Sequence, residues 1–268
     1  MFTQALHGVA GYLHSIWEYR YFWFSLVQAE LRRRYRRSVL GLGWSMLQPL
    51  AMTVVLALVY RKIFNISFWN FAPMLLTGLG FWTMFTQIVL QGCNCLVVAE
   101  PYLRQQPLPV AIFPLRTTLT VGFHFLVSLA VALGFVVCFK GVPPIGPLLT
   151  LLPALALLFA FGWAVAVVTS FVHVYFPDTQ HIAEVGLQAL MFLTPVMYPP
   201  ELLRTNGLEF LLRVNPLALL LELIRAPIIQ GAYPDPVNFG LMLGFVGALA
   251  ALATWTVAKF EERLIFAL

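Results

Sequence analysis

The sequence contains few charged residues. Only 10% of its 268 residues are Asp, Glu, Lys or Arg, and 60% are hydrophobic, whereas about a quarter of the residues of an ordinary soluble domain are charged. A soluble fold of this length could not bury so much apolar surface, and the mean hydropathy of +0.85 agrees. The composition therefore excludes a soluble globular protein and indicates helices in lipid.

The sequence also lacks a nucleotide-binding loop and a cysteine framework. None of its lysines lies in the GxxxxGK[ST] context that holds nucleotide phosphates. The three cysteines, Cys93, Cys95 and Cys138, have neither zinc nor disulfide spacing, and we interpret them as small core residues. We therefore expect no nucleotide hydrolysis by this chain, and no cofactor in it.

The acidic residues are scattered, apart from one group. Asp178, His181 and Glu184 are spaced by three at the start of an expected helix, a spacing that would suit a metal. The alternative, which we favour, makes Asp178 the helix N-cap after Pro177, so we expect no metal site. An integral-membrane glycosyl- or phosphoglycosyl-transferase stays an alternative function, but it would need more clustered carboxylates.

The apolar runs are long enough for spans of about 20 residues. A membrane barrel would instead show short alternating strands. Residues 198–236 are apolar but broken by charges and prolines, so we predict re-entrant outer helices there. The predicted fold is an all-α polytopic membrane protein with one domain and six spans, at residues 40–60, 71–99, 112–139, 148–174, 182–197 and 237–258.

Orientation follows from the basic residues. With six spans and both termini in the cytoplasm, ten of the 16 Lys and Arg residues lie on the inner side, a modest bias in the direction of the positive-inside rule. Arg61 and Lys62 would lie on the outer side, where their long side chains can reach the interface. The net charge of +5 is explained by this anchoring and needs no nucleic acid. We expect a multi-pass protein of the bacterial inner membrane.

Residues 1–39 form a predicted cytoplasmic tail and amphipathic interface helix. Aromatic side chains mix with charge over residues 12–35, a composition typical of the headgroup level. One role for the arginines that follow is topological anchoring; the other is holding the phosphates of a lipid-diphosphate substrate. The candidate phosphate-binding residues are Arg32, Arg33, Arg34, Arg36 and Arg37.

Three stretches resemble the permease subunits of ABC-2 polysaccharide exporters, which export O-antigens, capsules and teichoic acids. The first is AELRRRYRRSVLGLGWSMLQPL at residues 29–50. The second runs from Phe176 and Asp178 to Thr-Pro-Val-Met-Tyr-Pro at 194–199, and the third is Asn215-Pro216 with Glu222 and Arg225. The first stretch matches the family pattern at Arg34, Tyr35, Arg36, Ser38, Leu40, Gly41, Trp44 and Pro49.

This resemblance implies a homodimer paired with two copies of a cytoplasmic ABC ATPase subunit, which would bind the ATP. The family architecture places the ATPase contact in the loop between spans two and three, here residues 100–111, which Pro101, Pro107 and Pro109 would stiffen. The candidate coupling residues are Glu100, Tyr102, Arg104 and Gln105, with Asp178 as a second choice.

The family also has a continuous channel with aromatic walls, on which the apolar faces of sugar rings can stack. The alternative for any one ring is a place in the lipid-facing interface belt. The candidate channel residues are Trp69, Phe71, Phe81, Trp82, Phe85, Phe192 and Tyr198.

The resemblance thus implies export of a lipid-linked polysaccharide, most simply an O-antigen or a capsular polysaccharide. An ABC-2 small-molecule exporter would share the fold, but the arginine-rich N-terminus favours a glycan. Which glycan and lipid anchor are used stays open, as does a periplasmic or outer-envelope export partner.

Overall fold

The structure is a computed structural model, and the part of the chain that it describes is helical, without β-strands. It describes residues 2–36, 41, 43–63 and 67–268. Arg37 of the predicted phosphate site, and Ser38 and Leu40 of the first family stretch, lie outside these residues.

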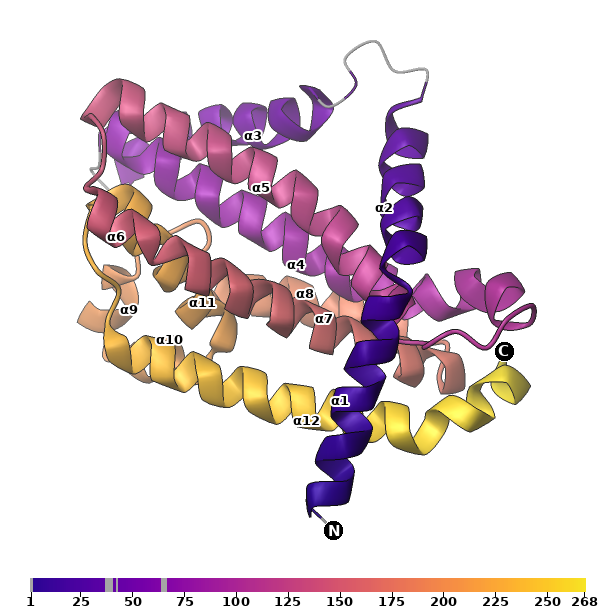
Figure 1. Cartoon of the computed structure of the whole chain (residues 1–268). Helices are drawn as coiled ribbons and strands as arrows, with labels where there is room; N and C mark the ends of the chain where they lie inside the picture. Colours follow the sequence, from indigo (N-terminus) through magenta and orange to yellow (C-terminus); the bar gives the residue numbers. More distant parts are fainter. Residues whose placement is uncertain (1, 37–40, 42, 64–66) are drawn as a thin grey trace.

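Four long helices form the body of the protein and run side by side across Figure 1. They are α4 (Phe68–Leu103), α5 (Ile112–Lys140), α7 (Leu151–Tyr175) and α12 (Pro236–Ala267). With the short α6 (Ile145–Leu149) ahead of α7, they supply four segments of the described chain that are long and apolar enough to cross a membrane. The all-helical membrane fold is therefore confirmed.

Two further helices correspond to the remaining predicted spans. The first is α3 (Gly43–Ile63), which has 21 residues and packs against α4 and α5. The second is α8 (Thr179–Leu193), which has 15 residues and is shorter than the roughly 20 that a perpendicular span needs.

The bundle has two distinct ends (Figure 1). Residues 104–111 and the C-terminus lie at one end, which we call the loop end. The opposite end carries α6, α9 (Glu201–Thr205) and α10 (Glu209–Val214), and we call it the short-helix end.

The N-terminal segment crosses the long helices steeply near the loop end (Figure 1). We predicted one interface helix there, but the chain forms two, α1 (Phe2–Glu18) and α2 (Arg20–Tyr35), separated at Tyr19. The indole Nε1 of Trp23 donates to the carbonyl of Ile16 at 3.1 Å, and buried Ile16 belongs to the loop-end core. The break therefore lets both helices pack on the bundle.

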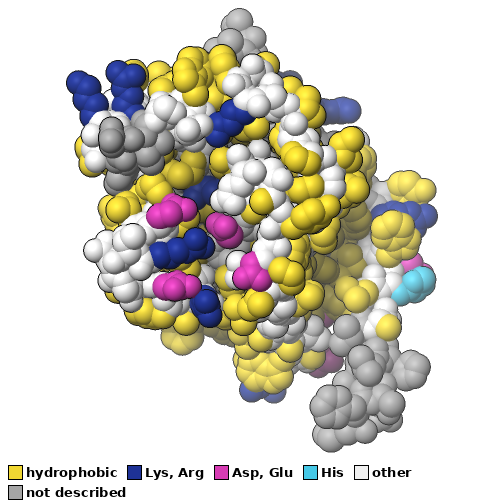
Figure 2. Space-filling view, turned by 90° about the vertical axis from the view of Figure 1, so that its left-hand side faces the viewer, with side chains coloured by type: hydrophobic (Ala, Val, Ile, Leu, Met, Phe, Trp, Pro, Cys, Tyr) yellow, Lys and Arg dark blue, Asp and Glu magenta, His cyan; other side chains and the backbone are white. Residues whose placement is uncertain are grey.

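The predicted outer segment folds as four short elements. After α9 and α10 come α11 (Pro216–Arg225) and the π-helical turn η1 (Ala226–Gln230), which Gly231 ends with a φ of 62°. Acidic and basic side chains gather in the middle of this face, surrounded by hydrophobic ones (Figure 2). A small cleft of about 80 Å³ lies there, and its charged lining residues are Arg204, Glu209, Arg213, Glu222, Arg225 and Asp235.

A buried arginine holds this segment to α4. The Arg225 side chain donates to the carbonyls of Met74 and Val196, each at 2.8 Å, and to the carbonyl of Pro195 at 2.5 Å. Arg225 is only 4% exposed. Because a Cβ on Gly78 would collide with both Arg225 and the carbonyl of Val196, α4 needs a glycine at this approach. We call this arrangement the arginine clamp.

Asn215 fixes the same segment from the start of α11. Its Oδ1 accepts from the amide of Leu217 at 3.0 Å, as an N-cap does, and its Nδ2 donates to the hydroxyl of Thr194 at 2.9 Å. The second and third family stretches, which are separate in sequence, therefore bind one another in the fold.

Candidate functional site

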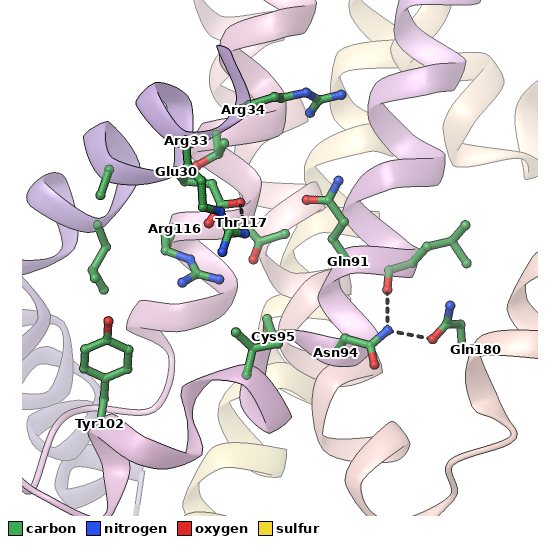
Figure 3. A pocket seen from close by; sticks show the side chains of 15 residues that line it. Glu30, Arg33, Arg34, Gln91, Asn94, Cys95, Tyr102, Arg116, Thr117 and Gln180 are labelled. Carbon is green, nitrogen blue, oxygen red and sulfur yellow. Dashed lines mark hydrogen bonds and ion pairs between the residues drawn. The ribbon is translucent and has the colours of Figure 1, made fainter. Parts of the chain in front are cut away.

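A large cavity lies at the loop end, between α2, α4, α5 and α8. Its volume is about 780 Å³, which is within the usual range of ligand sites. Figure 3 shows side chains from all four helices turned toward this space. We call it the basic cavity because three arginines, Arg33, Arg34 and Arg116, line it together with one acidic residue, Glu30.

Two arginines of the predicted phosphate cluster belong to this cavity. Arg33 and Arg34 come from the last turn of α2, and Arg33 Nη2 bonds Glu30 Oε1 at 3.1 Å. Arg32 and Arg36 do not line it, although all four described arginines of the cluster are exposed. Only part of the predicted cluster therefore faces the cavity.

Arg116 is a cavity residue that sequence reasoning missed. It lies in the second turn of α5, and its buried Nε has no hydrogen-bond partner among the described residues. A guanidinium inside a candidate membrane span is expensive unless it faces a cavity or a partner. Its position in an apolar run was the signal that could have identified it.

A second cavity lies next to the first, toward the short-helix end. It measures about 270 Å³ and is lined from α3, α4, α5 and α8, and we call it the middle cavity. Arg34 lines both cavities. Pro49, from the first family stretch, lines the middle cavity with it.

The predicted channel aromatics have different surroundings. Trp82 lines the middle cavity, whereas Phe71, Phe81 and Phe85 are buried in packed clusters. Trp69 stacks on Phe139 with ring centroids 4.2 Å apart.

The other two predicted channel residues lie at the end of α8 and just beyond it. Phe192 is 77% exposed, and the Tyr198 hydroxyl donates to its backbone carbonyl at 2.8 Å.

The predicted coupling residues surround the end of α4. Glu100 and Arg104 form an exposed ion pair at 2.8 Å, and Gln105 is exposed beside them. Tyr102 instead lines the basic cavity, and its ring packs edge-on against Phe22 of α2 at 6.1 Å.

A hydrogen-bond network anchors the remainder of this loop. Glu261 Oε1, on α12, accepts from the Tyr12 hydroxyl at 2.8 Å and from the amide of Val110 at 2.9 Å. The amide of Ala111 donates to the Tyr12 oxygen at 3.3 Å, and Trp163 of α7 donates to the Ala111 carbonyl at 3.1 Å. Burial, and then the charge of Glu261, raise the pKa of Tyr12 well above its ordinary value. Helices α1, α7 and α12 therefore all hold the loop.

The acidic group at the start of α8 gives no metal centre in the described part of the chain. Asp178 occupies the N-cap position, but its side chain makes no capping bond. His181 Nδ1 lies 3.8 Å from Glu184 Oε2, both largely exposed, and no group of three potential ligands is close enough to hold a metal among the described residues.

Comparison with known proteins agrees with this architecture. Residues 21–229 match the family described as ABC-2 type transporter. A protein named O-antigen export system permease protein RfbA, from Myxococcus xanthus, is 27% identical over 254 residues, which cover 94% of this chain and 95% of that protein. A protein of the same name from Klebsiella pneumoniae is 22% identical over 240 residues, or 88% of this chain and 91% of that protein.

Proposed function

This chain belongs to the ABC-2 type transporter family, and from that premise we propose that it is the membrane subunit of an ATP-driven exporter of a lipid-linked polysaccharide of the O-antigen class. The observation that carries this proposal is the match, over nearly the whole length of both chains, to relatives named O-antigen export permeases. The four apolar helical segments provide the membrane body that such a subunit needs.

The basic cavity supports a substrate with a charged phosphate headgroup. Three guanidinium groups against one carboxylate make the cavity electropositive, and arginine forks match phosphate oxygens. We assign the diphosphate of the lipid carrier to Arg33, Arg34 and Arg116. A neutral small molecule would not need this charge, which favours the glycolipid over a small-molecule cargo.

The loop end supports contact with an ATPase. The exposed pair Glu100 and Arg104, with Gln105, presents polar side chains at the end of α4, where the loop begins. The Glu261 network holds the other end of the loop, at residues 110–111, to three helices. Force applied to this loop would therefore reach the bundle. We place this end, both termini and the ATPase in the cytoplasm, with Asp178 as a further contact.

The assembly would be a homodimer in the bacterial inner membrane. In each copy, α3 and α8 would complete six spans, and α9 to η1 would form the outer re-entrant segment. The exposed aromatic rings Trp69 and Phe192 are then candidates for the passage between the two copies.

The test is purification of the chain from its native host in nanodiscs, followed by mass spectrometry of bound proteins and lipids. We expect a stoichiometric P-loop ATPase and a glycolipid. A chain that comes out alone and transfers sugars without ATP would replace this proposal with the transferase.

Arginine variants refine the test. We expect Arg33→Gln and Arg34→Gln to reduce glycolipid binding about tenfold or more, since hydrogen bonds to charged groups contribute about 1.5–3 kcal/mol each. Arg32→Gln removes a neighbouring charge outside the cavity and should have a smaller effect. Equal losses from all three variants would indicate general membrane anchoring instead.

A further inference from the structure

A stripe of hydrogen-bonding side chains runs along α4, inside an apolar membrane segment. Thr83, Gln87, Gln91 and Asn94 are spaced by four, four and three residues, which places them on one face of the helix. Gln91 Nε2 donates to Gln87 Oε1 at 3.0 Å. The stripe lines both cavities, because Thr83 and Gln87 line the middle cavity and Gln91 and Asn94 line the basic one. Figure 3 shows Gln91 and Asn94 at the basic cavity.

A matching stripe runs along α5. Thr117, Thr120, His124 and Ser128 are spaced by three, four and four residues. Because α5 runs antiparallel to α4, Thr117 and Thr120 line the basic cavity, whereas His124 and Ser128 line the middle cavity. The two stripes therefore line the same two neighbouring cavities, which share Arg34.

Two hydroxyls of the α5 stripe are buried without a partner. Thr120 and Ser128 are 3% and 4% exposed, and neither Oγ has a hydrogen-bond partner within the described chain. The neighbouring Thr117 behaves differently, since its Oγ1 donates to the carbonyl of Phe113 at 3.2 Å. Buried polar atoms are normally satisfied, and because Thr120 and Ser128 line the cavities, their hydroxyls are free to bond a molecule that enters them.

The chemistry of the stripes indicates what that occupant is. Amides and hydroxyls both donate and accept hydrogen bonds, as the hydroxyls of a sugar do. Arg33, Arg34 and Arg116 already supply charge for an anion, and a bound cation would require more carboxylate than Glu30 provides. Gln180 of α8 extends the amide set, because Asn94 Nδ2 donates to its Oε1 at 2.6 Å (Figure 3).

We propose that these two stripes form a binding site for the sugar hydroxyls of the transported glycolipid, directly beyond the arginines that hold its diphosphate. The site rests on the proposed function. It places the first sugars between α4 and α5, in hydrogen-bond reach of Gln87, Gln91 and Ser128, and it makes recognition of the glycan polar in this part of the path.

The test is binding of two probes to the full complex in nanodiscs. One probe is a polyprenyl diphosphate, and the other is the same lipid carrying a short oligosaccharide. We expect the wild type to bind the sugar-bearing lipid more tightly. Gln87→Met and Gln91→Met keep side-chain length but lose the amide, and together they should remove most of this preference, a loss of about fivefold or more, without weakening binding of the bare lipid.

Two controls separate binding from folding. Ser128→Ala removes an unpartnered hydroxyl, so it should leave the melting temperature unchanged or raise it, yet still reduce binding of the sugar-bearing lipid. Gln28→Met makes the same amide-to-thioether change, and Thr254→Val also removes a hydroxyl, at exposed positions that line neither cavity. Both variants should bind both probes as the wild type does.

The outcomes are distinguishable. The inference is overturned if the Gln87 and Gln91 variants keep the full preference for the sugar-bearing lipid, which would mean that only water occupies the stripes. It is also overturned if the wild type binds both lipids equally, and the proposed function survives that result. If the wild type binds neither lipid, the proposed function itself fails.

Discussion

Replacing Arg225 tests the arginine clamp most directly. Arg225→Met keeps much of the apolar stem and removes the guanidinium that reaches the carbonyls of Met74, Pro195 and Val196. Residues 194–196 are not helical. The carbonyls of Pro195 and Val196 therefore have no helical hydrogen bond that could replace the one from Arg225.

The expected loss follows from those two carbonyls. A buried acceptor left without a donor costs about 1–3 kcal/mol, so the substitution should lower the free energy of unfolding by about 2–6 kcal/mol. For a chain of this size that corresponds to a melting temperature roughly 10 °C lower. Arg225→Lys keeps the charge without the planar fork and should give a smaller loss.

The assay is thermal melting of the purified protein in one detergent, with Arg213→Met as the matched control. Arg213 lies in the same segment, but its bond to Glu209 at 3.1 Å is exposed, and such pairs contribute about 0–1 kcal/mol. The control should therefore melt within about 2 °C of the wild type. If Arg225→Met and Arg213→Met melt together, the clamp does not stabilise the segment and our reasoning is refuted.

Three further predictions concern individual positions. Gly78→Ala should destabilise the protein, because the added methyl group collides with Arg225. Gly134→Ala, whose methyl group meets nothing within 4 Å, should be neutral or stabilise the protein by up to about 1 kcal/mol. The melting temperature should therefore fall for the first variant and not for the second, and an unchanged melting temperature for Gly78→Ala would contradict the close approach. Glu261→Leu should speed amide hydrogen exchange of residues 110–111 about fivefold, with Glu262→Leu as the exposed control, and unchanged exchange would mean that the network does not hold the loop. The pKa of Tyr12 is raised in the folded protein. The stability that its neutral phenol contributes is therefore present below the ordinary pKa near 10 and is lost as the pH rises above that value. Between pH 8 and 10.5 the melting temperature should fall more steeply for the wild type than for Tyr12→Phe, and parallel curves would argue against a buried phenol.

The membrane helices could be predicted from the sequence because apolar runs in lipid have one stable backbone solution. Their ends were less predictable. We expected the loop to begin at residue 100, yet α4 continues through Pro101 to Leu103. Leu103 is buried and Tyr102 packs on α2 and α5, so tertiary contacts offset the hydrogen bond that the proline removes.

The family stretches indicated residues that matter but not how they interact. Asn215 and Arg225 carry no sign in the sequence of a bond to residues 194–196. Only the fold brings them together, because α11 returns beside the end of α8. The Glu261 network was missed for the same reason, since its Tyr12 and Val110 partners are 249 and 151 residues away.

The polar stripes show where the sequence held an unused signal. The four-residue spacing of Thr83, Gln87 and Gln91 inside an apolar run was visible, and polar groups in a membrane segment indicate a functional face by default. Our interpretation gave weight to the aromatic rings instead, four of which, Phe71, Phe81, Trp82 and Phe85, are buried in this structure. What spacing alone could not reveal is that Thr120 and Ser128 leave their hydroxyls unpartnered, because threonine and serine in a helix usually bond the preceding turn. The packing of α5 against α4 brings the two polar stripes to the same cavities, and only this arrangement makes them a candidate sugar site.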